Sequence, residues 1–161
     1  MNGSELPKSP QGEPLTSDAK KEIVRKLWRL HNKNDRDGVL ALLAPDFKAY
    51  SSTRPEPADT ETFARTIGMF NKAISDIHDE ILTLVAEDDY VVAEMVETGT
   101  WTGPLEFPGQ SLPPTNRSYR IPMVEFIRFN SDGLIAEMRN YYDTASLTQQ
   151  LGLDRNLFAS V

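Results

Sequence analysis

Two long β-rich runs joined by a tight turn constrain this sequence more than any other feature. The runs cover about residues 119–129 and 134–142, and the letters NSDG stand between them at 130–133. An Asp-Gly pair flanked by apolar, β-rich runs is a strong local signal for a hairpin. The stretch therefore predicts two antiparallel strands, and the residues that follow, up to 153, predict a short closing helix.

The alternation of side chains along these strands gives the hairpin one unusual face. If opposed residue numbers sum to about 263, every second residue points to the same side of the sheet. A carboxylate and a carboxamide on an otherwise mainly apolar face are costly to bury unless something binds there. The hairpin is therefore expected to form one wall of a pocket. The opposed pairs on this face are Glu125 with Met138, Met123 with Asn140, and Ile121 with Tyr142.

The composition limits the kinds of protein that this chain can be. Its 161 residues predict one domain with its own core. With 24 acidic and 17 basic residues, a net charge of −7 and no basic run, the chain is poorly suited to binding a phosphate backbone. No apolar run reaches membrane-spanning length, and the first residues lack a signal-peptide pattern.

The absence of cysteine and the scarcity of histidine narrow the chemistry further. Without cysteine there is no disulfide, thiol nucleophile or thiolate metal site, which is compatible with the expected cytoplasmic location. His31 and His78 are the only histidines, which argues against a histidine-rich metal site. No metal and no cofactor is therefore expected.

Three segments divide the chain. Residues 1–15 predict a disordered arm, because three prolines lie among glycine, serine and charged residues. Residues 16–153 predict the folded domain, and residues 154–161 predict a C-terminal tail.

The spacing of apolar residues changes from helical to strand-like along the domain. Possible N-caps precede the helical segments, and Pro45 ends the second of them. The predicted helices cover residues 16–32, 34–43 and 59–74. The predicted strands cover residues 47–52, 77–86, 90–102, 117–129 and 134–142. The last four strands would form an antiparallel meander, so the expected fold class is α+β.

A long loop, GPLEFPGQSLPPTN at 103–116, separates two of these strands. Four prolines and two glycines make it longer than a hairpin requires. One interpretation is a lid over the pocket that carries Leu105, Phe107 and Leu112. An ordered surface loop or a dimer contact is the alternative, and the sequence does not decide between them.

The same alternation extends the predicted pocket to residues 90–102. A pairing sum near 220 with the hairpin would place Glu97 beside Met123, and Met95 beside Glu125. The candidate catalytic residues are then Glu97, Glu125 and Asn140, and the candidate substrate contacts are Tyr50, Met95, Trp101, Met123, Met138 and Tyr142.

Such a lining suits proton transfer on an apolar substrate. A glutamate withdrawn from water has a raised pKa and exchanges protons more readily near neutral pH. Asn140 cannot act as a base, but it can donate a hydrogen bond to a carbonyl oxygen or an enolate. Methionine and tryptophan side chains fit flat, hydrophobic ligands. The candidate bases are Glu97 and Glu125.

Each candidate also has a structural interpretation. A glutamate in a strand more often faces solvent, and methionines more often fill a core. His31 is expected to end the first helix, and His78 is expected at the rim or on the surface, with catalysis as the lesser alternative. Asp143 is expected to cap the closing helix, with a role as catalytic acid as the lesser alternative.

Several short motifs support a family assignment. They are LLAPDF at 42–47, TGTWTGP at 98–104, PPT at 113–115, FIRF and DGLI within the hairpin, and YYD with QLG near the end. Over about residues 18–153 the chain resembles the SnoaL-like polyketide cyclases of the nuclear transport factor 2-like superfamily. This resemblance implies a cone-shaped fold, in which a curved antiparallel sheet wraps around N-terminal helices. It also implies a dimer with a cofactor-free pocket.

This sequence has different residue types at the positions where the resemblance implies catalytic residues. Ungapped matching places Asn140 where the cyclases carry a catalytic aspartate. The limonene-epoxide hydrolases place an arginine between two aspartates, and the matching residues are Met95 for the arginine, with Glu97 and Asn140 for the aspartates. What remains is one carboxylate, Glu97, facing an amide, with Glu125 nearby.

The sequence therefore predicts a cofactor-independent enzyme for a hydrophobic, aromatic or polycyclic oxygenated small molecule. Acid/base proton transfer would give cyclisation, isomerisation or elimination, with Asn140 and Tyr50 orienting the oxygen. A non-catalytic binding or carrier protein using the same pocket remains an alternative, as does a dimeric adaptor with a filled cone. The expected partners are a hydrophobic substrate and a second copy of the chain, with neither nucleic acid nor membrane.

Overall fold

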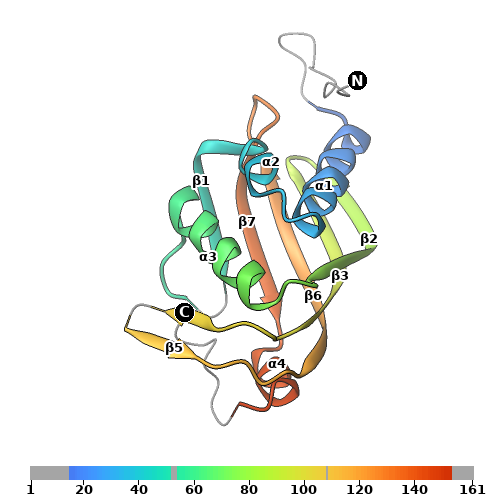
Figure 1. Cartoon of the computed structure of the whole chain (residues 1–161). Coiled ribbons are helices and arrows are strands. Elements are labelled where there is room, and N and C mark those ends of the chain that lie inside the picture. Colours follow the sequence, from blue (N-terminus) through green and yellow to red (C-terminus); the bar gives the residue numbers. More distant parts are fainter. Residues whose placement is uncertain (1–14, 52–53, 108, 154–161) are drawn as a thin grey trace, which may run out of the picture.

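Three helices precede most of the sheet, as the change in apolar spacing predicts (Figure 1). The computed structural model describes residues 15–51, 54–107 and 109–153. The predicted arm, apart from Leu15, and the predicted tail lie outside these residues, and Leu15 packs partly buried against the core. In chain order the elements are α1 (Ser17–Asn32), α2 (Arg36–Leu40), β1 (Leu43–Ser51), α3 (Thr60–Ala73), β2 (His78–Glu87), β3 (Tyr90–Thr100), β4 (Leu105–Phe107), β5 (Gln110–Leu112), β6 (Ser118–Phe129), β7 (Ile135–Tyr142) and α4 (Thr144–Gln150).

A capping side chain begins each of the four helices. Thr16, Asp35, Asp59 and Asp143 each accept a hydrogen bond from the backbone N–H three residues further on. Such caps satisfy N–H groups that the first turn of a helix leaves unpaired. The predicted caps of the first, third and closing helices are confirmed, including Asp143. No helix in the described ranges is long and apolar enough to cross a membrane.

The second helix is shorter than predicted. It ends at Leu40, and Leu43 instead begins β1, where it pairs with Ile135 of β7. The backbone oxygen of Leu42 also accepts a hydrogen bond from Ile135 N at 2.9 Å. Pairing with a strand about 90 residues later thus overrides the local helical spacing, which alone cannot report such a partner.

Five strands form one curved sheet in the order β1-β7-β6-β3-β2. The four predicted strands of the meander are confirmed and pair antiparallel, whereas β1 joins the far edge parallel to β7. Helices α1 and α3 lie across one face of this sheet, and α4 packs against β6 (Figure 1). The predicted α+β class is confirmed.

The predicted strand registers are each wrong by two residues. Within the hairpin Glu125 opposes Asn140 and Met123 opposes Tyr142, a sum of 265. Two local features account for the difference. The turn has three residues, closed by Asn130 N to Leu134 O with Gly133 at φ 76°, and a bulge follows at the start of β7. Each feature adds one residue, so every side chain keeps its predicted face.

The pairing of β3 with β6 also differs from the predicted register by two residues. Met95 opposes Met123 and Glu97 opposes Ile121, a sum of 218. The residues that lie side by side across β3, β6 and β7 therefore differ from those predicted. One row holds Met95, Met123 and Tyr142, and the next holds Ala93, Glu125 and Asn140. An even shift preserves the face, because side chains alternate with a period of two.

The segment between β3 and β6 forms a small hairpin of its own, β4 with β5. Leu105 is fully buried, Phe107 and Leu112 pack against the core, and β4 contacts α3. None of the described residues of this segment lines the cavity described below. The three apolar side chains that the lid interpretation assigned to the pocket mouth therefore anchor the segment to the core.

We expect Asn130→Ala to weaken the main hairpin. Its Oδ1 accepts hydrogen bonds from the backbone N–H groups of Asp132, at 3.0 Å, and Leu134, at 2.9 Å. Losing both should lower the free energy of unfolding by about 1–2 kcal/mol, measured by urea denaturation. Ser131→Ala, at the exposed tip of the same turn, is the matched control. Equal stabilities for the two variants would contradict this role of Asn130.

Candidate active site

A cavity of about 260 Å³ lies between the helices and the inner face of the sheet. Most of its wall is apolar and comes from α1, α3, β6, β7 and α4. At one side Tyr50, with 41% of its surface exposed, lies beside Ser51 and Arg54 and connects the wall to the molecular surface. The apolar lining includes Leu27, Trp28, Val39, Phe63, Ile67, Phe70, Ile74, Ile77, Ile121, Met123, Met138, Leu147 and Leu151.

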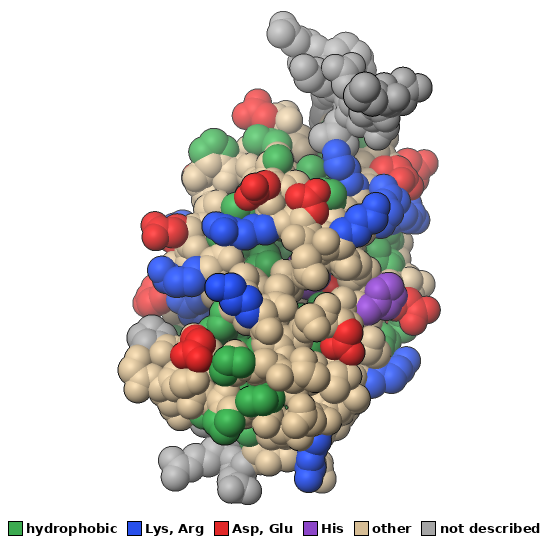
Figure 2. All heavy atoms as spheres, in the orientation of Figure 1, with side chains coloured by type: hydrophobic (Ala, Val, Ile, Leu, Met, Phe, Trp, Pro, Cys, Tyr) green, Lys and Arg blue, Asp and Glu red, His purple; other side chains and the backbone are tan. Residues whose placement is uncertain are grey.

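The surface around the helices carries charges of both signs. Figure 2 shows acidic and basic side chains interspersed over this face, with smaller groups of apolar side chains between them. The mixed charge of this outer surface contrasts with the mainly apolar lining of the cavity.

The inward face predicted for the main hairpin is confirmed. All six of its residues line the cavity, and Glu97 of β3 and Tyr50 of β1 join them. Seven of the nine candidate site residues thus meet around one space, while their roles remain predictions. These seven are Tyr50, Glu97, Met123, Glu125, Met138, Asn140 and Tyr142.

Two candidate substrate contacts lie elsewhere. Met95 is fully buried in the core beside Met123 and is not part of the cavity lining. Helix α1 packs against β2 and β3, which fills this part of the sheet's inner face. Trp101 follows the last residue of β3 and is also fully buried outside the lining. Its indole N–H donates to the backbone oxygen of Gly103 at 2.6 Å, so it fixes its own loop.

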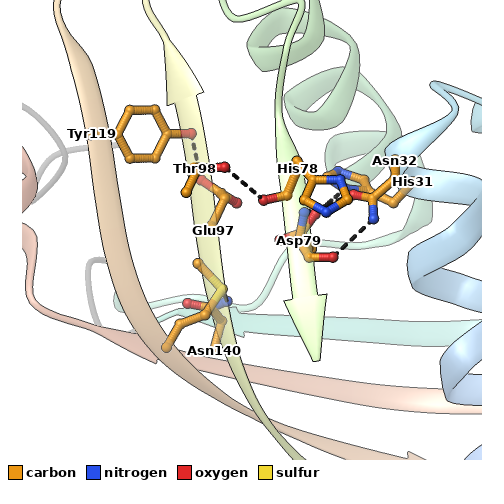
Figure 3. A network of polar contacts seen from close by, with 9 residues as sticks. His31, Asn32, His78, Asp79, Glu97, Thr98, Tyr119 and Asn140 are labelled. Atoms are coloured by element: carbon orange, nitrogen blue, oxygen red, sulfur yellow. Dashed lines mark hydrogen bonds and ion pairs between the residues drawn. The ribbon is translucent and has the colours of Figure 1, made fainter. Parts of the chain in front are cut away.

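Glu97 accepts a short hydrogen bond inside the protein. The Tyr119 hydroxyl donates to Glu97 Oε1 at 2.6 Å (Figure 3). Asp79 of β2 lies opposite Glu97 in the strand pairing, so the two carboxylates share the inner face. Burial, and then the negative charge of Asp79, raise the pKa of Glu97 to about 7, although Tyr119 and His31 oppose the shift.

Glu125 is the more deeply buried of the two cavity glutamates. Only 3% of its surface is exposed, and it opposes Asn140 in the sheet. Burial, and then the charge of Asp79, raise its pKa to about 8, while the neighbouring Asn140 amide acts in the opposite direction. Glu125 is thus mainly protonated at neutral pH.

Two buried oxygen atoms at this position have no hydrogen-bond partner. They are Glu125 Oε2 and Asn140 Oδ1. The amide nitrogen of Asn140 has only a weak acceptor, Met123 Sδ at 3.7 Å. Unpaired buried polar atoms are unfavourable, so this end of the cavity is suited to a ligand group, such as a hydroxyl, that can donate a hydrogen bond to the Asn140 oxygen.

A third polar group at the cavity, formed by His31 and Asp79, was not predicted from the sequence. His31 Nδ1 lies 2.7 Å from Asp79 Oδ2, and the Asp79 side chain is completely buried. The side-chain amide of Asn32 holds the backbone of Asp79 through two hydrogen bonds, at 2.8 and 2.9 Å (Figure 3). His31 does end the first helix as predicted, but it also lines the cavity, whereas His78 is exposed.

Part of this group could have been found by extending the strand alternation. Tyr119 is two residues before Ile121 and shares its inner face. Asp79 opposes Glu97 once the pairing of β2 with β3 is known. His31 has no such signal, because its contact with Asp79 joins residues 48 positions apart.

The pKa values of His31, Tyr119 and Tyr142 are also shifted by burial and by the nearby carboxylates. Burial lowers the pKa of His31, but its hydrogen bond to Asp79 and the charges of Asp79 and Glu97 outweigh this, so the pKa is raised overall. Burial and the charge of Glu97 raise the pKa of Tyr142 to about 12, and burial with the same charge raises that of Tyr119 further. Both phenols are neutral donors at physiological pH. Among the described residues no cluster of three or more potential metal ligands is present.

Comparison with known proteins identifies relatives across nearly the whole domain. The model of a family described as SnoaL-like polyketide cyclase matches residues 21–151. A comparison with curated proteins finds no match.

Solved structures of similar proteins share the fold. A putative hydroxylase, AclR, from Streptomyces galilaeus is 25% identical, with a TM-score of 0.74 over 85% of this chain and 98% of its own. A putative SnoaL-like polyketide cyclase from Jannaschia sp. CCS1 is 19% identical, with a TM-score of 0.75 over 91% and 100%. IdmH, a putative polyketide cyclase from Streptomyces antibioticus, is 24% identical, with a TM-score of 0.69 over 83% and 99%.

The raised pKa of Glu125 predicts a specific pH dependence of stability. Between pH 4.5 and about 8 the unfolded chain has lost this proton while the folded chain keeps it. The free energy of unfolding should therefore fall as the pH rises through this range. Glu125→Gln should remove this contribution and raise stability near pH 8.5 by roughly 2–4 kcal/mol relative to the wild type, by urea denaturation.

Glu80→Gln is the control for this measurement. Glu80 lies on β2 and is exposed on the opposite face. Part of the pH dependence should persist in Glu125→Gln because of Glu97. A curve for Glu125→Gln that parallels the wild type would show that Glu125 is ionised in the folded protein.

Proposed function

The chain belongs to the SnoaL-like polyketide cyclase family, and we propose that it is an enzyme that moves protons on a hydrophobic, oxygenated small molecule. The substrate would carry a carbonyl group, so that removal of a neighbouring C–H proton gives an enolate. This chemistry requires a base near the carbon that loses the proton and hydrogen-bond donors near the carbonyl oxygen.

Glu97 is the proposed base, and its position carries the proposal. It lines the cavity, and its pKa of about 7 leaves a large fraction ionised at neutral pH. A carboxylate with this pKa is also more basic than an ordinary glutamate, so it takes a C–H proton more readily. Tyr119 fixes its orientation through the hydrogen bond to Oε1.

Glu125 and Asn140 are the proposed partners of the substrate oxygen. Glu125 is mainly protonated at neutral pH, and a carboxylic acid kept neutral in an apolar site can donate a hydrogen bond. The Asn140 amide is a second donor, since its present acceptor is only the weak Met123 sulfur. Two neutral donors would stabilise an enolate oxygen as negative charge develops on it.

The apolar wall supports the proposed substrate class. Phe63 and Phe70 of α3, with Ile74 just after that helix, line the same cavity as the sheet residues Met123 and Met138. Aromatic and thioether side chains contact flat carbon skeletons well. This arrangement supports an aromatic or polycyclic substrate, with cyclisation, isomerisation and elimination as the reactions that begin from an enolate.

A binding or carrier protein is the second candidate. It is favoured by Asn140, which stands where the sequence resemblance to the cyclases implies a catalytic aspartate. In that case a ligand would enter the same cavity and leave without chemical change.

Hydrogen exchange separates the two functions without knowledge of the natural substrate. In D2O the wild type should catalyse deuterium incorporation next to the carbonyl of benzylacetone, followed by proton NMR. Glu97→Gln should slow this exchange by at least about 100-fold, because an amide cannot take the proton. The wild-type rate should rise with pH through about 7, since the ionised form of Glu97 is active.

The exposed Glu80 of β2 again provides the control. Glu80→Gln should exchange at the wild-type rate. Binding of benzylacetone without enzyme-dependent exchange would favour the carrier, and exchange that survives in Glu97→Gln would reject Glu97 as the base.

We also propose that the outer face of the sheet joins two copies of the chain. Val92, Val124 and Phe126 are only partly buried there, and Tyr141 has 48% of its surface exposed. The strand pairing places Val92 beside Phe126 and Val124 beside Tyr141, while Glu94 flanks Val124 and the Arg139 guanidinium lies 5.6 Å from the Phe126 ring centre. Exposed apolar side chains flanked by charged ones are typical of an interaction site.

Charge placed in this area should dissociate the dimer. Val124→Arg should elute as a monomer in size-exclusion chromatography with light scattering, whereas the wild type should have the mass of two chains. Leu82→Arg, at an exposed position of edge strand β2, is the control and should remain dimeric. A monomeric wild type, or a dimer that tolerates Val124→Arg, would reject this interface.

A further inference from the structure

The base mechanism leaves the His31–Asp79 pair in the cavity wall unused. His31 is on α1 and Asp79 on β2, and the 2.7 Å contact between them brings an imidazole to the same cavity as Glu97. The imidazole retains 13% side-chain exposure, while the carboxylate retains none. The pair is thus directed to the cavity through its histidine.

The surroundings of Asp79 fix the orientation of this imidazole. Asn32 binds both backbone polar groups of Asp79, and β3 holds the other side of the same strand. A carboxylate fixed against Nδ1 keeps a proton on that nitrogen. Among the described residues no hydrogen bond reaches Nε2, which is therefore the nitrogen able to exchange a proton with a molecule in the cavity.

We propose that His31 is the general acid of this site and that the reaction is loss of water from a β-hydroxy ketone. This inference rests on the proposed function and specifies it, because it selects elimination among the reactions that an enolate allows. Asp79 would be a positioning residue, since it acts on the substrate only through His31.

The step balances with the groups already present. Glu97 takes the proton from the carbon between the carbonyl and the hydroxyl-bearing carbon, and the electron pair of that C–H bond forms the new C=C bond. The bond from carbon to the hydroxyl oxygen breaks, and the departing oxygen takes its second proton from His31 Nε2. The products are an enone and water. Transfer of a proton from Glu97 back to His31, through water, restores both groups.

The requirement for a second group separates elimination from isomerisation. A single base can move a proton from one carbon to another, but hydroxide is a poor leaving group and needs a proton as the C–O bond breaks. A cationic imidazole is a much stronger acid than the neutral phenols of Tyr119 and Tyr142. The cavity therefore offers its strongest acid and its base from different elements, α1 and β3.

The electrostatic environment favours the charged form of His31. The charged groups that act on it are Asp79 of β2 and Glu97 of β3, while its neighbours on α1, Trp28 and Asn32, are neutral. The raised pKa of His31 favours the protonated imidazole, and the pKa of about 7 for Glu97 leaves part of this carboxyl ionised near neutral pH. This pairing supports a reaction that needs both.

The aldol adduct of acetone and benzaldehyde tests the proposal directly. The wild type should convert it to benzylideneacetone, measured by the ultraviolet absorbance of the conjugated enone. Exchange into benzylacetone, which has no hydroxyl group, reports the base alone. In His31→Gln the ratio of elimination to exchange should fall by at least about 100-fold. Both rates are measured at the same pH near 7, so that the ionised fraction of Glu97 affects them equally and cancels in the ratio.

His78→Gln is the matched control, because His78 is exposed and its substitution should leave the ratio at the wild-type value. Exchange by the wild type without elimination would overturn the inference but keep the proposed function. An unchanged ratio in His31→Gln would also overturn it. Loss of both activities in the wild type would overturn the proposed function and the inference with it.

A second readout needs no substrate. With only two histidines, ¹⁵N-histidine labelling gives two imidazole signals, and His78→Gln assigns them. His31 should be protonated at neutral pH, with a hydrogen-bonded Nδ1–H, and Asp79→Asn should lower its pKa while the protein remains folded by circular dichroism. A neutral imidazole at pH 7 in the wild type would overturn its role as acid.

Discussion

Antiparallel pairing of β6 with both β3 and β7 is the constraint on which the rest of this structure depends. It places side chains from three strands on one curved face at intervals of two residues. The helices cover that face without filling it, and a cavity remains. Since the same pairing carries Glu97, Glu125 and Asn140, the fold and the candidate chemistry share one origin.

Burial then determines how the polar groups of the cavity behave. Glu97 and Glu125 are held away from water near a third carboxylate, Asp79, so the free energy of ionisation is unfavourable for each. The cavity accommodates this cost by keeping Glu125 mainly protonated and by placing the imidazole of His31 against Asp79. The charge of Asp79 thus acts on all three of these groups, His31, Glu97 and Glu125.

Much of the fold follows from local patterns in the sequence, whereas distances between segments do not. The period of two assigns Glu97, Glu125 and Asn140 to the inner face, and this survives a register error of two residues. The register itself depends on the αL conformation of Gly133 and on a bulge in β7, which the letters NSDG do not specify uniquely. Family membership, in turn, is confirmed by the match over residues 21–151.

The parts that could not be predicted are those that rest on long-range packing. Leu43 pairs with Ile135 rather than ending a helix, and His31 meets Asp79 only because α1 crosses β2. Met95 and Trp101 are assigned to the inner face by the same alternation, but neither lines the cavity. Met95 is packed in the core, and Trp101 is held by a hydrogen bond to its own loop. Alternation identifies the side of a sheet, but it does not say where the space on that side is empty.

The modest size of the cavity has a consequence for selectivity. At about 260 Å³ it lies just below the range of roughly 300–1,000 Å³ that encloses drug-sized ligands. A molecule of several fused rings would enter by one end only, with the remainder lying past Tyr50 in solvent. The end of the substrate that is narrow and apolar enough to enter the cavity would then determine which carbon reacts. Such regiochemical control requires no contact with the part of the substrate that stays outside.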